Sequence, residues 1–194
     1  MVNTLKFILA SASPRRVDLL TQIGITPDAI QPADVNEEEL ANESPRQLAL
    51  RLAVDKCLAV AQNNTGHIIL GADTVVGLGT RILPKAEDEE VARDCLNKLS
   101  GRRHQVYGGL AIQDANGKLY TRVVKTIVSF KRLSKLEIDA YIASGEWDGK
   151  AGGYAIQGLA AAYIRAVSGS YSNIVGLSLF ETSQILQGIN FKKH

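Results

Sequence analysis

The chain has 194 residues, of which 45% are hydrophobic and 22% charged, and its formal net charge is +2 at pH 7. This length is sufficient for a substantial core, and the near-neutral charge argues against general nucleic-acid binding, which requires a strongly basic surface. No apolar stretch approaches the roughly 20 residues of a membrane-spanning helix, and the apolar run at residues 7–10 is too short for a secretory signal. We therefore expect a cytoplasmic globular protein with no membrane partner and no direct nucleic-acid partner.

The two cysteines, Cys57 and Cys95, lack the spacing of a zinc site and fall in helix-like patterns. We expect two buried or partly buried free thiols in a reducing cytosol. The three histidines are scattered along the chain, so no His-rich metal site is predicted.

An apolar run at residues 5–11 predicts the first strand, and the Ser-Pro pair that follows predicts a helix over residues 14–24 with Ser13 at its N-cap. A strand at residues 28–36 then runs into the acidic stretch NEEE, which contains Glu37. A solvated loop is the default interpretation of such a stretch.

Arg15 and Arg16 lie in the first turn of the predicted helix, where the helix dipole disfavours cations. An anion held by the free backbone N–H groups, the Ser11 and Ser13 hydroxyls and the two guanidinium groups would remove this conflict. The sequence therefore indicates a phosphate-binding turn. The alternative is a solvated basic turn in which Ser13 merely caps the helix.

A second Ser-Pro pair opens a long amphipathic helix over residues 44–64, and a β-branched strand follows at residues 67–79, interrupted by the letters GAD. Asp73 is the acid in that interruption. An ionised carboxylate among apolar residues is unfavourable unless it is paired or bound to metal, and breaks in strands are where α/β proteins place catalytic groups. The alternative is an Asp that caps a turn, with Thr74 hydrogen-bonded in the same loop.

Two lysines could share a pocket with Asp73. Lys56 lies in the long helix, and Lys85 follows the letters ILP after the Asp73 strand. Each lysine alone would be interpreted as a surface residue.

The second half of the chain predicts a helix over residues 86–101, alternating strands within 104–133 joined by an Asn-Gly turn, and a helix over 134–145. A short strand at 161–169 and a helix over about 174–187 close the chain. Hairpin and crossover connections together indicate an α/β fold: a single domain, residues 1–194, with a mixed, twisted sheet flanked by helices. Two lobes with a cleft between them would suit this arrangement.

The stretch GKAGGYAIQG, residues 149–158, holds four glycines together with Lys150 and Gln157. Glycines permit a close approach of backbone to a ligand, and the Gln157 amide offers both a donor and an acceptor to a base edge. Alone, this motif is weak.

Taken together, these motifs resemble the Maf (septum-formation-inhibitor) family of nucleoside triphosphate pyrophosphatases. The similarity rests on LASASPRR, DVNEEE, GADTVV followed by ILPK, LSGRRHQVY, SGEWDGKAGGYAIQG and GSYSNIVGLSLFE, which occur in the family's order over essentially the whole chain. The resemblance implies a Maf/ITPase-like fold and a homodimer. It also implies hydrolysis between the α and β phosphates of a nucleoside triphosphate, which yields a monophosphate and pyrophosphate.

The resemblance also implies roles for individual residues. Asp73 matches the family's proton acceptor, and Glu37 matches an acidic position associated with metal or water. Glu37 and Asp73 are therefore the expected ligands of a divalent cation, Mg²⁺ or Mn²⁺. The phosphate-handling positions are matched by Ser11, Arg15, Arg16, Lys56 and Lys85.

Three positions distinguish the branches of the family. Arg15, Thr74 and Gln157 agree with the branch that acts on dTTP and UTP, whereas the 7-methyl-GTP branch carries Trp, Gln and Glu there. The expected substrates are thus dTTP, UTP and modified pyrimidine nucleotides, and the expected role is to limit incorporation of non-standard nucleotides and to arrest cell division. The alternatives are a 7-methyl-GTP pyrophosphatase and a non-catalytic nucleotide-binding regulator of septum formation. One departure is Asn36, which stands where the family usually has Asp.

Overall fold

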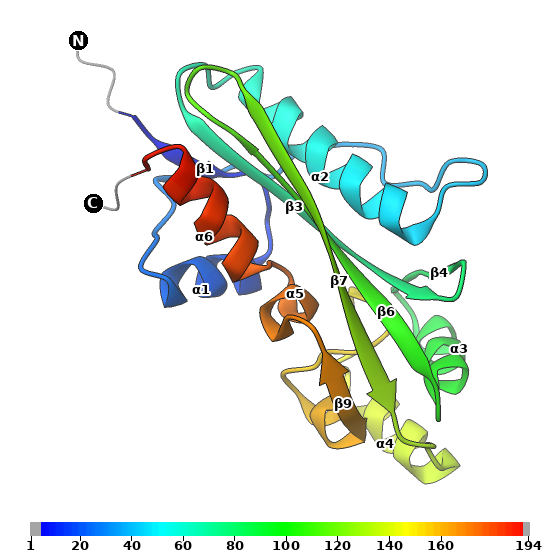
Figure 1. Cartoon of the computed structure of the whole chain (residues 1–194). Helices are drawn as coiled ribbons and strands as arrows, with labels where there is room; N and C mark the ends of the chain where they lie inside the picture. The colour runs from blue at the N-terminus through cyan, green and yellow to red at the C-terminus, as the bar shows by residue number, and fades with distance from the viewer. Residues whose placement is uncertain (1–4, 192–194) are drawn as a thin grey trace.

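The computed structural model of the chain describes residues 5–191 (Figure 1). Its elements in chain order are β1 (Phe7–Leu9), α1 (Pro14–Gln22), β2 (Ala29–Ile30), α2 (Pro45–Ala61), β3 (Ile68–Leu78), β4 (Arg81–Leu83), β5 (Lys85–Ala86), α3 (Glu89–Leu99), β6 (Arg103–Gln113), β7 (Leu119–Phe130), α4 (Lys135–Ser144), β8 (Lys150–Ala151), the 3-10 helix η1 (Leu159–Tyr163), β9 (Ile164–Ser168), α5 (Tyr171–Val175) and α6 (Leu179–Gly188).

The main sheet has the strand order β2-β1-β3-β6-β7-β9, and β4 pairs with β3 outside this path. β1 runs parallel to β2 and β3, whereas the β3-β6, β6-β7 and β7-β9 pairs are antiparallel. Elements gather at both ends of the long β6-β7 ribbon, with α1 and α6 at one end and α3, α4 and β9 at the other (Figure 1). The expected α/β fold with a mixed sheet is confirmed.

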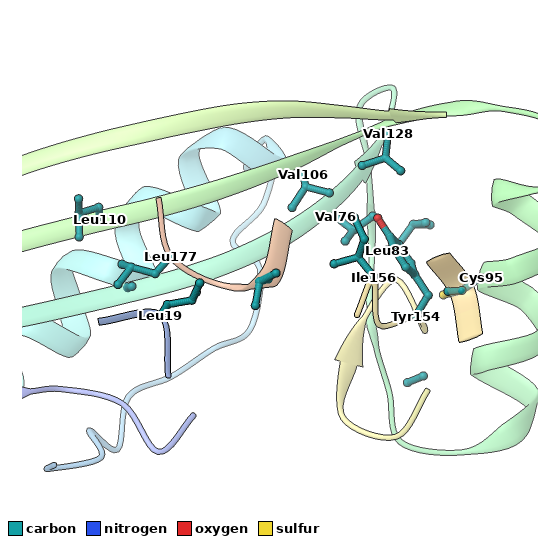
Figure 2. Close-up of a cluster of buried hydrophobic side chains, with 14 of the residues drawn as sticks. Leu19, Val76, Leu83, Cys95, Val106, Leu110, Val128, Tyr154, Ile156 and Leu177 are labelled. Atoms are coloured by element: carbon teal, nitrogen blue, oxygen red, sulfur yellow. The ribbon is translucent and has the colours of Figure 1, made fainter. Parts of the chain in front are cut away.

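Different helices cover the two faces of the sheet. On one face, apolar side chains of α2 pack against β3 and β6. On the other face, α1, α3, α4 and α6 contribute to the largest apolar cluster, in which Leu19 and Leu177 approach Leu110 while Tyr154 and Ile156 approach Val76 (Figure 2). The sheet is thus buried on both faces, which explains its continuous apolar strands.

α2 lies so close to the sheet that only glycine fits beneath it. A Cβ atom at Gly71 of β3 would lie 2.3 Å from the carbonyl oxygen of Ala53, and one at Gly109 of β6 would lie 1.8 Å from the carbonyl oxygen of Ala49. Because real Cβ atoms do not approach backbone oxygens this closely, both positions require glycine. This contact fixes the height and position of α2 over β3.

One edge of β3 is left open at its centre. β1 pairs with β3 only over Ile68–Leu70, and β4 pairs with it only over Val76–Leu78. In the described part of the chain no strand covers residues 71–75 on this edge, although β6 covers the other edge throughout. The interruption of this strand predicted at the letters GAD is therefore wrong: β3 is continuous there, and the letters mark a gap between the strands that pair with it.

Other boundaries differ from the prediction. The strand expected at 28–36 is reduced to the two residues of β2, and the helix expected at 174–187 is divided into α5 and α6 at Gly176, whose φ is 146°. Ser13 occupies the N-cap of α1, but its side chain makes no capping hydrogen bond. Cys57 and Cys95 are buried free thiols, as expected, and burial raises the pKa of both to about 11.

The glycine contact under α2 can be tested with Gly71→Ala. The added methyl group has no space below the carbonyl of Ala53, so we expect a loss of about 1–3 kcal/mol in the free energy of unfolding. Gly188→Ala is the control, because a Cβ atom there meets no heavy atom within 4 Å. Urea denaturation measures both variants. Equal midpoints for Gly71→Ala and the wild type would contradict the packing described here.

Candidate active site

A cavity of about 310 Å³ opens beside the gap in the β3 edge. It lies between the turn at residues 10–16 and the glycine-rich segment at residues 149–157, and its volume is within the range of small-ligand sites. All the residues that the sequence placed in the site line this cavity: Ser11, Arg15, Arg16, Glu37, Lys56, Asp73, Thr74, Lys85 and Gln157. The structure therefore brings together side chains that are distant in sequence.

A second hollow adjoins the cavity and shares Glu37, Asp73 and Lys85 with it. Its other charged lining residues are acidic: Glu38, Glu39 and Glu87. The first cavity instead holds five cationic side chains and two carboxylates. Because the triphosphate expected from the sequence would require positive charge, the first cavity is the candidate substrate site.

Lys56 bridges the two carboxylates of the cavity. Its ammonium lies 2.7 Å from Oδ1 of Asp73 and 2.6 Å from Oε1 of Glu37. Lys56 is only 8% exposed and Asp73 only 5%, so each charge needs its partner. Lys56 sits on the stripe of α2 that faces the sheet, among apolar residues, and is therefore not the surface lysine that its residue type alone suggests.

Glu37 links the acidic loop to both lysines. The Lys85 ammonium contacts Oε2 of Glu37, while Lys56 holds the other oxygen. Partial burial raises the pKa of Glu37, but the hydrogen bonds from Lys56 and Lys85 outweigh it and lower the pKa to about 2. Glu37 is thus solvent-exposed, as expected for an acidic loop, but it is also ionised and paired with both lysines at the cavity.

Arg16 and Arg15 differ in their surroundings. Arg16 is 8% exposed, and its guanidinium donates hydrogen bonds to the carbonyl oxygen of Gly176 at 2.9 Å and to Oγ of Ser11 at 2.8 Å. Burial lowers the pKa of Arg16, against an opposing attraction from Asp73. Arg16 therefore joins α1 to the turn after α5, while Arg15 lines the cavity half-buried.

The carboxylates suit a magnesium-type cation. Within residues 5–191 no group of three or more His, Cys, Asp or Glu side chains could hold a metal ion. Mg²⁺, however, is commonly bound by one or two carboxylates together with substrate phosphates, and Glu37 and Asp73 lie close enough for one ammonium to contact both. This donor set fits a hard cation that keeps part of its coordination for other oxygen ligands.

The glycine-rich segment is fixed to the rest of the fold at several points. Lys85 and Ala86 of β5 pair with Ala151 and Lys150 of β8. Tyr154 packs edge-to-face with His104, whose Nε2 lies 2.8 Å from the tyrosine hydroxyl. The segment that carries Gln157 is therefore held in place next to Lys85.

Two of the polar side chains that line the cavity, Lys150 and Tyr154, are not assigned to the site by the sequence. Lys150 was noted only as part of a glycine-rich run, and Tyr154 was not singled out. His104, which supports Tyr154, is fully buried although it follows two arginines in the chain. The alternation of His104, Val106 and Leu110 along one face of β6 is the signal that would have placed the histidine in the core.

The chain matches the family model described as Maf-like protein over residues 6–189. It is 61% identical to the dTTP/UTP pyrophosphatase of Paramagnetospirillum magneticum over 95% of this chain and 97% of that protein. It is 53% identical to the dTTP/UTP pyrophosphatase of Caulobacter vibrioides over 95% of this chain and 96% of that protein.

A solved structure shares the fold. The HAM1 protein from Coxiella burnetii superimposes with a TM-score of 0.51 at 15% identity, covering 95% of this chain and all of that chain. This likeness concerns the fold alone. Within residues 5–191, no helix is both long and apolar enough to cross a membrane.

The buried histidine makes stability depend on pH. Burial lowers the pKa of His104 from 6.5 to about 4. Between these values the unfolded chain binds a proton that the folded protein does not, so stability falls as pH falls from 6.5 to 4, by about 3 kcal/mol from this residue. His104→Phe lacks this contribution, and urea denaturation at pH 7 and pH 4 should show a smaller loss for the variant. Equal losses, or an NMR titration of His104 near pH 6.5, would contradict its burial as a neutral group.

Proposed function

The chain belongs to the family of Maf-like proteins, and on this premise we propose that it is a nucleoside triphosphate pyrophosphatase acting on dTTP and UTP. The names of the similar proteins support this activity. The observation that carries the proposal is the cavity in which Asp73 is held by Lys56 among further cationic side chains. Phosphoryl transfer requires charge neutralisation and in-line positioning, which such a site supplies.

In the proposed reaction, Asp73 accepts a proton from a water molecule whose oxygen attacks the α phosphorus. A bond forms between that oxygen and the α phosphorus, and the bond from the α phosphorus to the bridging oxygen breaks. The electron pair of the broken bond leaves with pyrophosphate. The contact of Lys56 with Oδ1 orients the Asp73 carboxylate for this role.

The cations of the cavity have different proposed tasks. Lys56 and Lys85 would stabilise the charge of the triphosphate, and Arg16 would hold Ser11 and the phosphate-binding turn in position. Glu37 and Asp73 would hold Mg²⁺ or Mn²⁺, which neutralises phosphate charge when it is bound. Asn36 cannot add a third carboxylate, so the substrate phosphates would complete the coordination.

We assign the choice of substrate to three residues that line the cavity, Gln157, Arg15 and Thr74. Gln157 is exposed and can present its amide to the pyrimidine edge, while Arg15 lies within the phosphate-binding turn and the Thr74 hydroxyl lies 3.5 Å from the Arg16 guanidinium. These three residues support dTTP and UTP over 7-methyl-GTP. The proposal includes modified pyrimidine nucleotides as further substrates.

The proposal also covers the setting of the enzyme. The two buried free thiols agree with a reducing cytoplasm. A homodimer is proposed from the family resemblance.

The decisive variant is Asp73→Asn, measured with a nucleotide panel in Mg²⁺ or Mn²⁺ while monophosphate and pyrophosphate are followed together. The wild type should release both from dTTP and UTP, and Asp73→Asn should lose about 10²- to 10⁴-fold in kcat because the amide cannot accept the proton. Asp18→Asn, at an exposed position of α1, is the matched control. Near wild-type turnover by Asp73→Asn would refute the role of Asp73, and release of orthophosphate would refute the predicted bond cleavage.

A further inference from the structure

Most cations of the cavity are already paired within the protein. Lys56 contacts Asp73 and Glu37, and Lys85 contacts Glu37. The Arg16 guanidinium is occupied by the carbonyl of Gly176 and the hydroxyl of Ser11. The charged groups of these three side chains are thus engaged by protein groups before a ligand binds.

Arg15 and Lys150 are the exceptions among the cations that line the cavity. Within the part of the chain that the structure describes, the Arg15 side chain has no ion pair and no hydrogen bond, and the Lys150 side chain has no ion pair. The Lys150 ammonium donates one hydrogen bond, to the carbonyl oxygen of Asp148 at 2.8 Å. Arg15 and Lys150 are therefore the two cations of the cavity whose charged groups contact no other polar side chain among the described residues.

Arg15 and Lys150 line the same cavity, so their like charges act on each other. Burial lowers the pKa of Lys150, the nearby charge of Arg15 lowers it further, and attraction from Asp148 opposes both effects. Two like charges placed together on the wall of one cavity are unfavourable in the free protein. An anion between them converts this repulsion into two charge-assisted contacts.

The backbone holds Lys150 in place on its side of the cavity. Lys150 pairs with Ala86 in the β5-β8 ladder, and the preceding N–H of Gly149 donates to the carbonyl oxygen of Ala86 at 2.8 Å. Arg15 is held in the first turn of α1, next to the buried Arg16. A ligand between Arg15 and Lys150 would therefore join the two sides of the cavity.

We propose that Lys150 is a substrate-binding residue which, together with Arg15, clamps one phosphate group of the triphosphate. The inference rests on the proposed function, since it assigns a new contact within that site. The glycine-rich segment then has two tasks: Gln157 presents its amide to the base, and Lys150 binds phosphate. A phosphate bound between Arg15 and Lys150 would explain why two cations without an ion pair lie at this place in the cavity.

A double-mutant cycle tests the clamp on the full chain. Arg15→Gln, Lys150→Gln and the double variant are compared with the wild type, and Lys135→Gln, at an exposed position of α4, is the matched control. Calorimetry with inorganic tripolyphosphate measures binding in the absence of turnover, and steady-state kinetics with dTTP separate KM from kcat. Because the binding measurement needs no reaction, it tests the clamp even if the proposed activity fails.

We expect each single variant to weaken tripolyphosphate binding and to raise KM for dTTP by about 10- to 100-fold, with a smaller change in kcat. The double variant should lose less than the product of the two single losses, since both side chains hold the same group. Lys150→Arg should restore most of the binding. Thermal denaturation checks that each variant folds, and Lys150→Met replaces Lys150→Gln if the latter does not.

Two results would overturn the proposal. One is binding by Lys150→Gln within about twofold of the wild type, as expected for Lys135→Gln. The other is a double variant whose loss equals the product of the single losses, which would mean that Arg15 and Lys150 act on separate groups.

Discussion

A Cβ atom at Gly71 would lie 2.3 Å from the carbonyl oxygen of Ala53, so α2 can approach β3 as it does only over glycine. The same Cβ atom would lie 2.6 Å from the backbone nitrogen of Cys57, the residue next to Lys56. The contact that brings α2 onto the sheet therefore also sets the position of Lys56 over Asp73. Because β1 and β4 leave the edge of β3 open at this point, a carboxylate in the middle of a strand can reach a ligand.

The charges of the cavity divide into two sets. The paired set, Lys56 and Lys85 with Glu37 and Asp73, is arranged before any ligand binds and can orient water and a metal ion. The second set has no ion pair within the described residues: Arg16 is hydrogen-bonded to the neutral groups of Gly176 and Ser11, and Arg15 and Lys150 contact no other polar side chain. A site of this kind combines preorganisation for chemistry with residual attraction for a polyanion. The repulsion between cations that lack an ion pair destabilises the protein only while no anion is bound.

Local sequence signals pointed to part of the residues that line the cavity, whereas Glu37, Lys56 and Lys85 were expected there only from the family resemblance. Arg15 and Arg16 stood out because cations are unfavourable in the first turn of a helix, and Asp73 because its flanks are apolar. The break expected in β3 was wrong because the polar residue reflects a gap between neighbouring strands, which local sequence does not encode. Lys150 was not assigned because its place in the cavity depends on the β5-β8 pair, a contact between segments far apart in the chain.

The central claim is that water held by Asp73 attacks the α phosphorus of a pyrimidine nucleoside triphosphate. Hydrolysis of dTTP in ¹⁸O-labelled water, followed by mass spectrometry of both products, tests it most directly. The account predicts that the label enters the monophosphate and that the pyrophosphate stays unlabelled. Label in the pyrophosphate would place the attack on the β phosphorus and contradict the mechanism assigned to this cavity.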